Sequence, residues 1–248
     1  IGAFCKLLLR ELDIHVYSHI VSIKDVHIDP KQLEEISLDA VSLIESSEMR
    51  CSDPSLDEEM KRAVDEAIEK GETIGGTFEV RAVGVPVGLG SHVHWDRKLD
   101  GRLAQAVMSI NAIKSVEVGS GLESDPYGSD FHDEIFYAKK KREFYRKTNR
   151  AGGIEGGMSN GEEIIVRGVV KPIPTLRKPL MSVDFATKEP FEAQYERSDT
   201  CIVPAAGVIG EAMVSIILVQ AVQEKFGGDN LQEIQDNLDN YRRLTKKM

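Results

Sequence analysis

Apolar residues recur every three or four positions at the start of the chain: Ile1, Phe4, Leu7, Leu8 and Leu12. This spacing predicts a helix that begins upstream of the first residue. Residues 14–26 then alternate between polar and apolar types, which predicts a half-buried strand. The alternation places His15 and His19 on the polar face of that strand, where we expect both rings to be solvated.

Two charged helices are predicted next. Asp29 and Pro30 are typical of a helix start, and the helix is expected to run to about residue 45. The sequence SLDE at residues 55–58 is a capping pattern for a second helix that reaches Lys70 and ends at Gly71. Neither helix carries a catalytic constellation, so we expect both in the outer layer of the fold.

The second half of the chain alternates between strand and helix patterns. A β-branched strand is predicted at residues 77–83, an amphipathic helix at 98–113 and a further strand at 163–170. The helix at 98–113 has apolar residues at core spacing: Leu99, Leu103, Ala106, Val107 and Ile110. A largely apolar helix at 204–226 and a charged one at 231–248 complete the chain. The alternation favours a mixed α and β fold but does not define its topology.

A glycine-rich loop stands out between residues 148 and 162, before the strand at 163–170. Its glycines are Gly152, Gly153, Gly156, Gly157 and Gly161. Such a loop can bring bare backbone amides close to a ligand, and Lys171 and Thr175 follow on a turn stiffened by Pro172 and Pro174. The pattern predicts an anion-binding cradle. A flexible loop that serves only tight chain reversals is an equally open interpretation.

Composition narrows the class of protein. The 248 residues are 41% hydrophobic and 29% charged, as in ordinary globular proteins. No apolar run approaches the roughly 20 residues that span a bilayer, and no signal-peptide pattern opens the chain. Three dispersed cysteines without a CxxC motif favour a reduced cytoplasmic setting. The net charge of −10 argues against a nucleic-acid partner.

Positive charge is nevertheless gathered in one region of the sequence. The residues are Arg142, Arg146, Lys147, Arg150, Arg167, Lys171, Arg177, Lys178 and Arg197. Arg197 and Asp199 lie two positions apart on a predicted extended segment, so their side chains point the same way. They form either a site that binds an anion and transfers a proton or a plain local ion pair. A metal site built on His92 and His94 is disfavoured, because no third ligand has a recognisable spacing.

Several long motifs resemble the chorismate synthase family, in the family's order. They are WDRKLDGRLAQAVMSINAIK, TNRAGGIEGGMSNG, KPIPTL, ERSDTC, VPAA and GEAM. The resemblance implies an α+β fold of two βαβ-type sandwich layers with helices outside the sheets, assembled as a homotetramer. It also implies that residues 1–248 are one domain that lacks the family's N-terminal third, including its catalytic histidines.

The resemblance further implies the reaction and its ligands. Family members convert 5-enolpyruvylshikimate 3-phosphate to chorismate by 1,4-anti elimination of phosphate, with reduced FMN. The motifs put FMN contacts at Asn111, Ala112, Gly156, Lys171, Pro172, Ile173, Pro174, Thr175 and Arg197. Asp199 would take part in proton transfer next to the flavin N5.

Three questions stay open at this level. Ser115 and Leu122 depart from the family's usual Gly and Phe, which puts packing near the flavin in doubt. A catalytically incompetent flavin- or phosphate-binding paralogue is the alternative to an active enzyme. The source of the reduced flavin, NADPH or an external reductant, is also undecided, although the lack of a GxGxxG fingerprint favours an external one.

Overall fold

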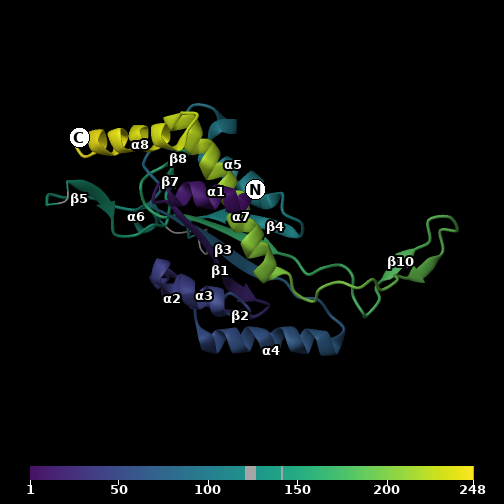
Figure 1. Ribbon diagram of the computed structural model, residues 1–248. Helices are drawn as coiled ribbons and strands as arrows, with labels where there is room; N and C mark the ends of the chain where they lie inside the picture. Colours follow the sequence, from purple (N-terminus) through teal and green to yellow (C-terminus); the bar gives the residue numbers. More distant parts are fainter. Residues whose placement is uncertain (121–126, 141, 248) are drawn as a thin grey trace.

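The computed structural model describes residues 1–120, 127–140 and 142–247, so Leu122 lies outside the described residues (Figure 1). Five strands form the main sheet: β1 (His15–Ile23), β2 (Val26–His27), β3 (Gly76–Val83), β4 (Ile113–Val118) and β9 (Ile164–Val170). Their order is β2-β1-β3-β9-β4, and every pairing is antiparallel. Because β3 and β4 both run antiparallel to β9, they run parallel to each other. Helix α5 (Leu99–Met108) connects them, which makes a split βαβ unit.

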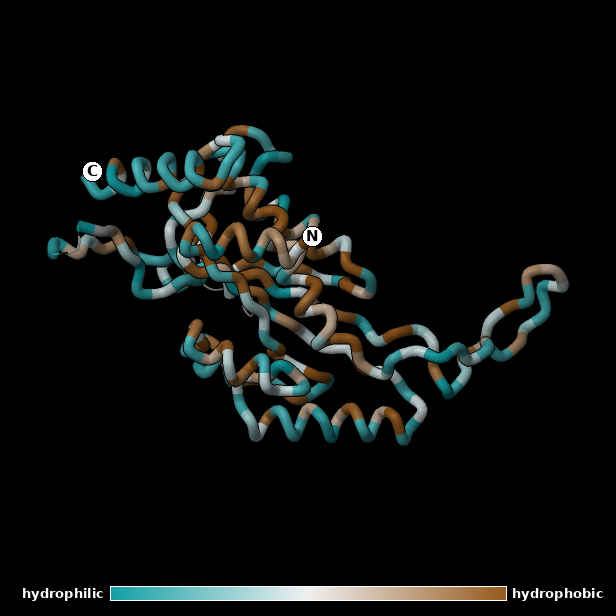
Figure 2. The backbone as a smooth tube through the Cα atoms, in the orientation of Figure 1, coloured by the Kyte–Doolittle hydropathy of each residue, from teal (hydrophilic) through white to brown (hydrophobic). Residues whose placement is uncertain are grey.

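Helices flank this sheet, which confirms the expected α+β class. On one face α7 (Val203–Phe226) packs along β1 and β3, with α1 (Gly2–Arg10) and α5 beside it. The side of the sheet away from α7 carries three short elements and one long helix in sequence order. They are α2 (Pro30–Glu35), the 3₁₀ turn η1 (Leu38–Ala40), α3 (Val41–Ser46) and the long helix α4 (Pro54–Lys70). Hydrophobic residues follow the sheet and α7, where the core lies (Figure 2).

The helix expected over residues 29–45 is broken in two. Asp29 caps α2 as predicted, with its carboxylate accepting from the Lys31 amide, but α2 ends before Ile36. Ile36 is extended (φ −67°, ψ 124°), and its side chain is buried. Helix α4 is capped by Asp53, two residues before the expected Ser55, and it ends at Gly71 with φ of +68° as predicted.

Helix α7 corrects one expectation. Its 24 residues are long and apolar enough to cross a membrane by length and composition, which contradicts the statement that no run approaches that length. In the structure half of the apolar window is buried against the protein. Glu211 near its middle is buried and accepts from the Ser18 amide at 3.0 Å and from Arg50 at 2.8 Å. These contacts are those of a core helix of a globular domain.

Two strand pairs project from opposite sides of the body (Figure 1). We call β5 (Ile135–Ala138) and β6 (Glu143–Arg146) the ribbon, and residues 176–199 the arm. The arm carries β10 (Met181–Val183) and β11 (Pro190–Glu192), which pair with each other. The remaining elements are η2 (Trp95–Arg97), α6 (Gly128–Phe131), β7 (Ile154–Glu155), β8 (Met158–Ser159) and α8 (Leu231–Thr245).

Candidate functional site

One end of the sheet brings together two of the predicted flavin-binding segments. Ile113 at the start of β4 pairs with Val170 at the end of β9. The Lys171 amide then donates to the Ala112 carbonyl at 2.9 Å. Ala112 takes a positive φ of 70°, unusual for a residue with a side chain, where the chain turns from α5 into β4. Asn111 and Ala112 therefore lie beside Lys171 and Pro172, although about sixty positions separate them in the sequence.

The proline-stiffened turn at residues 171–175 is anchored on both sides. The Thr73 hydroxyl donates to the Ile173 carbonyl at 2.6 Å, which ties the turn to the segment before β3. The Ser198 hydroxyl donates to the Thr175 carbonyl at 3.1 Å. This second bond holds the two ends of the arm together, so Arg197 and Asp199, the neighbours of Ser198, lie at the arm's base close to Thr175.

Lys171 and Arg197 are the two cations predicted to bind an anion here, and no described residue neutralises either of them. Lys171 donates to the Pro172 carbonyl at 3.2 Å. Across residues 1–120, 127–140 and 142–247, neither cation forms an ion pair with a carboxylate. The local Arg197–Asp199 pair that the sequence left open is thus not formed. Both groups are free to bind an external anion, which would satisfy their charges.

An open cavity of about 830 Å³ adjoins the turn. Val169, Val170 and Pro172 form one wall, and Gly75 and Thr77 of the neighbouring segment form another. Helix α4 contributes Ala63, Glu66, Ala67 and Lys70. Ligand pockets usually measure about 300–1,000 Å³ and are mainly apolar with a few polar groups. The cavity has the size for a flat ring system, and charged side chains share its lining with the apolar ones. Pro172 is the predicted flavin contact that lines it, whereas Arg197 is not among the lining residues.

Gly156 lies elsewhere. It occupies the two-residue turn between β7 and β8, where Gly156 (φ 60°) and Gly157 (φ 86°) both need the left-handed region. The Gly157 carbonyl accepts from the Leu99 amide at the start of α5, whereas Ala112 follows the end of that helix. The seven residues of β9 also separate the glycine loop from Lys171, and a strand rises about 3.3 Å per residue, so roughly 25 Å lies between them.

Most of the glycine loop serves close packing. A Cβ on Gly152 would lie 2.3 Å from Gly119, and one on Gly153 would lie 2.5 Å from the Glu163 carbonyl oxygen. Gly156 differs, because a Cβ there would meet nothing within 4 Å. Its amide is thus approachable from outside, but a single chain does not bring it to Lys171, Thr175 and Arg197.

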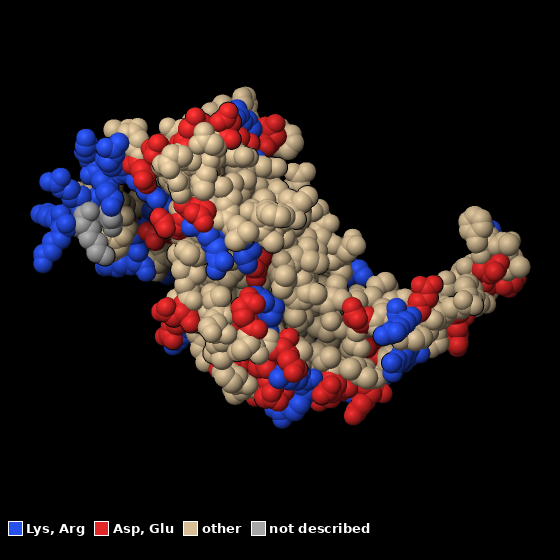
Figure 3. All heavy atoms as spheres, viewed as in Figure 1, with Lys and Arg blue, Asp and Glu red and all other residues tan. Residues whose placement is uncertain are grey.

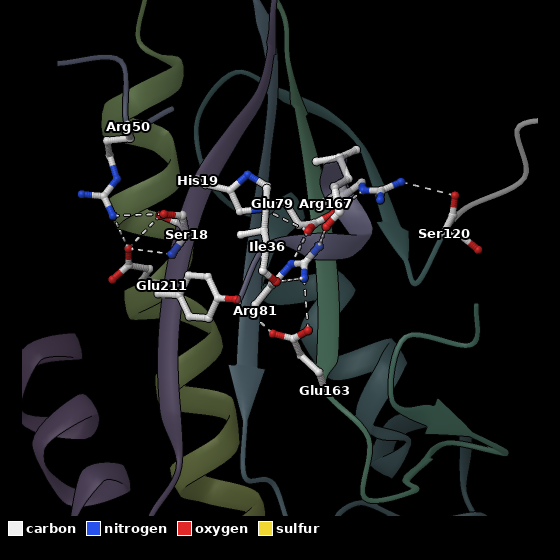
Figure 4. Close-up of polar contacts among 12 residues, drawn as sticks. Ser18, His19, Ile36, Arg50, Glu79, Arg81, Ser120, Glu163, Arg167 and Glu211 are labelled. Carbon is white, nitrogen blue, oxygen red and sulfur yellow. Dashed lines mark hydrogen bonds and ion pairs between the residues drawn. The ribbon is translucent and has the colours of Figure 1, made fainter. Parts of the chain in front are cut away.

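A buried charge cluster crosses β1, β3 and β9, and the sequence analysis missed it (Figure 4). Glu79 is its centre: one carboxylate oxygen meets His19 Nε2 at 3.1 Å and Arg81 Nε at 2.6 Å, and the other meets Arg167 Nε at 2.5 Å. Arg81 also reaches Glu163 at 3.2 Å. The predicted solvation of His19 is wrong, because its side chain is fully buried. Charged residues at alternate positions of the β3 pattern were the available signal.

Burial and charge act in opposite directions within this cluster. Burial raises the pKa of Glu79, but the hydrogen bond and charge of His19 and the charges of Arg81 and Arg167 outweigh it, so the pKa lies well below its usual value. At Glu163 burial wins over the attraction of Arg81, and the pKa is raised. Glu79 is therefore the anion that neutralises the buried cations.

Comparison with known proteins connects this geometry to a family. A family model for chorismate synthase matches residues 1–223. The chain belongs to the chorismate synthase family. It is 52% identical over 247 residues to the chorismate synthase of Solibacter usitatus and 52% identical over 246 residues to that of Sulfurihydrogenibium sp.. These alignments cover 99% and 98% of this chain but 63% of each relative, just under two thirds.

A solved structure agrees with the family assignment. A crystal structure of chorismate synthase superposes with a TM-score of 0.85 at 41% identity, covering all of this chain and 68% of that one. In the present chain, Ser115 pairs with Val169 next to a register shift in β4. Ser115 is one of the two departures from the family pattern. The substitution therefore lies at the sheet end that carries Ala112 and Lys171.

Proposed function

We propose that this protein acts as a chorismate synthase, eliminating phosphate and a C6 proton from 5-enolpyruvylshikimate 3-phosphate to give chorismate, with reduced FMN. One observation carries the proposal: the turn at residues 171–175 lies between Ala112 and the base of the arm, and Lys171 and Arg197 have no carboxylate partner among the described residues. A ligand-sized cavity adjoins the turn at Pro172. Family membership supports the same reaction. Cytoplasmic location and a homotetramer belong to this proposal.

The residues fit the cofactor by charge and shape. The apolar walls by Val170 and Pro172 suit the flavin ring, and Lys171 and Arg197 supply charge for phosphate or carboxylate groups. Asn111, Ala112, Ile173, Pro174 and Thr175 would complete the contacts from the same sheet end, and Gly156 would contribute an amide. When bound, the reduced flavin supplies the chemistry that lets the carbon–oxygen bond break without net redox change.

The chain's own residues would hold and neutralise the anions. A phosphate that leaves with its electron pair gains charge in the transition state, which nearby fixed cations stabilise. Asp199 is exposed at the arm's base, two positions from Arg197, and can accept a proton at its carboxylate and pass it to solvent.

The first prediction concerns the cations. Lys171→Ala or Arg197→Ala should weaken binding of reduced FMN by about 10- to 100-fold, because each removes a charge-assisted hydrogen bond of roughly 1.5–3 kcal/mol. Anaerobic calorimetric titration of the complete protein measures this. Lys178→Ala is the matched control, since Lys178 already pairs with Glu72 at 3.6 Å. Unchanged affinity in both variants would remove the site assignment.

Activity separates an enzyme from an incompetent paralogue. Anaerobic phosphate release from 5-enolpyruvylshikimate 3-phosphate with reduced FMN is expected for the complete protein. Flavin binding without phosphate release would instead identify a binding-only paralogue. If the complete protein neither binds flavin nor releases phosphate, the proposed function is wrong.

A further inference from the structure

We propose that Thr73 is a positioning residue for the proposed flavin site. It belongs to residues 71–75, the connection between α4 and β3, which we call the clamp. The clamp holds the turn at residues 171–175 and the segment after Asp199 in fixed positions relative to each other. This inference rests on the proposed function for the identity of the ligand, whereas the contacts of the clamp stand on separate observations.

Two consecutive residues of the clamp bond to two separate parts of the site. The Thr73 hydroxyl donates to the Ile173 carbonyl at 2.6 Å, in the middle of the proline-stiffened turn. The Ile74 amide donates to the Thr200 carbonyl at 2.9 Å, directly after Asp199. One short segment of the chain therefore holds both the turn that carries the predicted flavin contacts and the residue that follows the predicted proton acceptor.

The clamp is itself fixed at both ends. Gly71 ends α4 with a φ of +68°, and its amide donates to the Ile68 carbonyl at 3.1 Å. Strand β3, the middle strand of the main sheet, begins directly after the clamp. The Gly75 carbonyl also accepts from the Lys24 amide at 3.0 Å, which connects the clamp to the turn between β1 and β2. Because both ends are fixed, the residues between them can hold whatever is bonded to them.

Gly75 brings the clamp directly against the start of the turn. A Cβ on Gly75 would lie 2.1 Å from the Val170 carbonyl oxygen and 3.1 Å from the Lys171 carbonyl carbon. A side chain at this position would push the two segments apart, so only glycine allows their backbones to meet here. The clamp therefore contacts the end of β9 at the point where the Lys171 amide donates to Ala112.

The clamp also contacts the start of the arm. The Lys178 amide donates to the Gly71 carbonyl at 3.2 Å, and the Lys178 ammonium lies 3.6 Å from the Glu72 carboxylate. Figure 3 shows basic and acidic side chains next to one another where the arm leaves the body. The same short connection thus holds the chain before, within and after the turn at residues 171–175.

The turn depends on such outside contacts for its order. Residues 172–175 lie in no helix or strand, and the two prolines among them have no backbone N–H to donate. In the part of the chain that the structure describes, the hydrogen bonds to the carbonyls of the turn come from the Thr73 and Ser198 hydroxyls and from the Lys171 ammonium. When the ammonium binds an anion instead, the two hydroxyls remain to fix these carbonyls.

Thr73 acts through the turn and not on the ligand. Its side chain lines the cavity of about 830 Å³, but its hydroxyl hydrogen is already donated to the Ile173 carbonyl. A hydroxyl has one hydrogen to donate, so it cannot donate to a ligand at the same time. Without this bond the turn would occupy more positions in the free protein, and ordering it again on binding would lower the affinity.

Removal of the hydroxyl at constant side-chain shape tests the positioning. Thr73→Val in the complete protein should weaken binding of reduced FMN by about three- to tenfold, the equivalent of one neutral hydrogen bond. Thr73→Ser keeps the hydroxyl and should restore most of the affinity. Thr245→Val is the matched control, because its hydroxyl donates to the Arg242 carbonyl at 3.0 Å at the end of α8, and it should leave the affinity unchanged. Anaerobic calorimetric titration measures all three, and wild-type affinity in Thr73→Val would overturn the inference.

A double-mutant cycle distinguishes positioning from direct contact with the ligand. If Thr73 acts by holding the turn that carries Lys171, its hydroxyl matters less once the ammonium is gone. Thr73→Val should therefore weaken flavin binding by about twofold or less in the Lys171→Ala background. The same three- to tenfold loss in both backgrounds would show that the two residues act independently, and would overturn the positioning role.

A measurement without flavin separates this inference from the proposed function. In the free protein, Thr73→Val should speed hydrogen exchange of the Lys171 and Lys178 amides by about fivefold or more, because their acceptors, Ala112 and Gly71, lie on either side of the loosened turn. Amides in the middle of β3 and β9 should not change. Unchanged exchange at both lysines would overturn the clamp. Faster exchange together with a wild type that does not bind reduced FMN would instead overturn the proposed function, and with it the role of Thr73 in flavin binding.

Discussion

At the scale of single residues, Glu79 neutralises the buried polar face of the sheet. It is fully buried and contacts His19, Arg81 and Arg167, while Arg81 satisfies the carbonyls of Leu33 at 2.6 Å and Ile36 at 2.7 Å. One carboxylate thereby fixes the segment after α2 over the sheet. Removing one partner of a buried ion cluster leaves the others uncompensated, which costs more than the pair contributes when intact.

We expect Glu79→Gln to lower the free energy of unfolding by about 3–5 kcal/mol, the cost of unpaired buried charge. Glu163→Gln is the matched control and should change it by no more than about 1 kcal/mol, because burial already disfavours the charged form of Glu163. Urea unfolding at neutral pH measures both. Equal losses in the two variants would show that Glu79 has no special role.

The same residue determines part of the acid sensitivity. The pKa of Glu79 is held below the value of 4.5 that it has when unfolded, so its contribution is complete above that pH and is lost as pH falls below it. The free energy of unfolding should therefore fall more steeply below pH 4.5 in the wild type than in Glu79→Gln. Parallel pH profiles would contradict this account.

At the scale of elements, the contact between α7 and the sheet depends on missing side chains. Phe78 of β3 fills the space over Gly168 of β9 and Gly210 of α7. A Cβ on Gly210 would lie 2.7 Å from the Phe78 ring, and one on Gly168 would lie 2.5 Å from it. The helix can approach the strands this closely only with glycine at both positions.

Gly210→Ala should consequently destabilise the fold by about 1–3 kcal/mol through overpacking, despite alanine's better helix propensity. Gly101→Ala in α5 is the control, because a Cβ there meets only the Trp95 carbonyl at 3.7 Å, and it should stabilise by about 0.5–1 kcal/mol. Thermal and urea unfolding give both values. A stabilising Gly210→Ala would mean that the helix can shift away from Phe78 at no cost.

At the scale of the whole molecule, local stability is uneven. The sheet and α7 hold the buried core, whereas the arm contacts the body mainly at its base, through Gly71 and Glu72. Elements with few buried contacts open at low free-energy cost. The arm's order therefore depends on what covers it.

Backbone amides of β10 and β11 should exchange rapidly with deuterium in dilute protein and slow by at least tenfold at concentrations where copies associate. Amides of β3 and β9 should be protected in both conditions and serve as the internal control. Hydrogen exchange with mass spectrometry over a dilution series measures this. Protection of the arm that does not depend on concentration would show that the hairpin is stable by itself.

The sequence alone determined the elements with a local cause. The helical period predicted α1 and α5, a long apolar segment and a charged one predicted α7 and α8, a β-branched run predicted β3, a strand was predicted where β9 lies, and Gly71 was correctly predicted as a helix end. These helices, strands and helix ends depend on residues within a few positions of one another, so the local sequence pattern is enough to predict them. The motifs also fixed the family, because long ordered segments from residue 95 to residue 213 do not match by chance.

Only the tertiary structure decided what depends on distant partners. His19 is buried because Glu79 pairs with it across two strands, and the helix after Asp29 breaks because Arg81 binds the carbonyls of Leu33 and Ile36. Lys171 meets Ala112 through strand pairing, while β9 keeps Gly156 far from both. The periodicity of a strand shows which of its side chains share a face. Long-range packing determines which strands become neighbours and at which end of the sheet a loop lies.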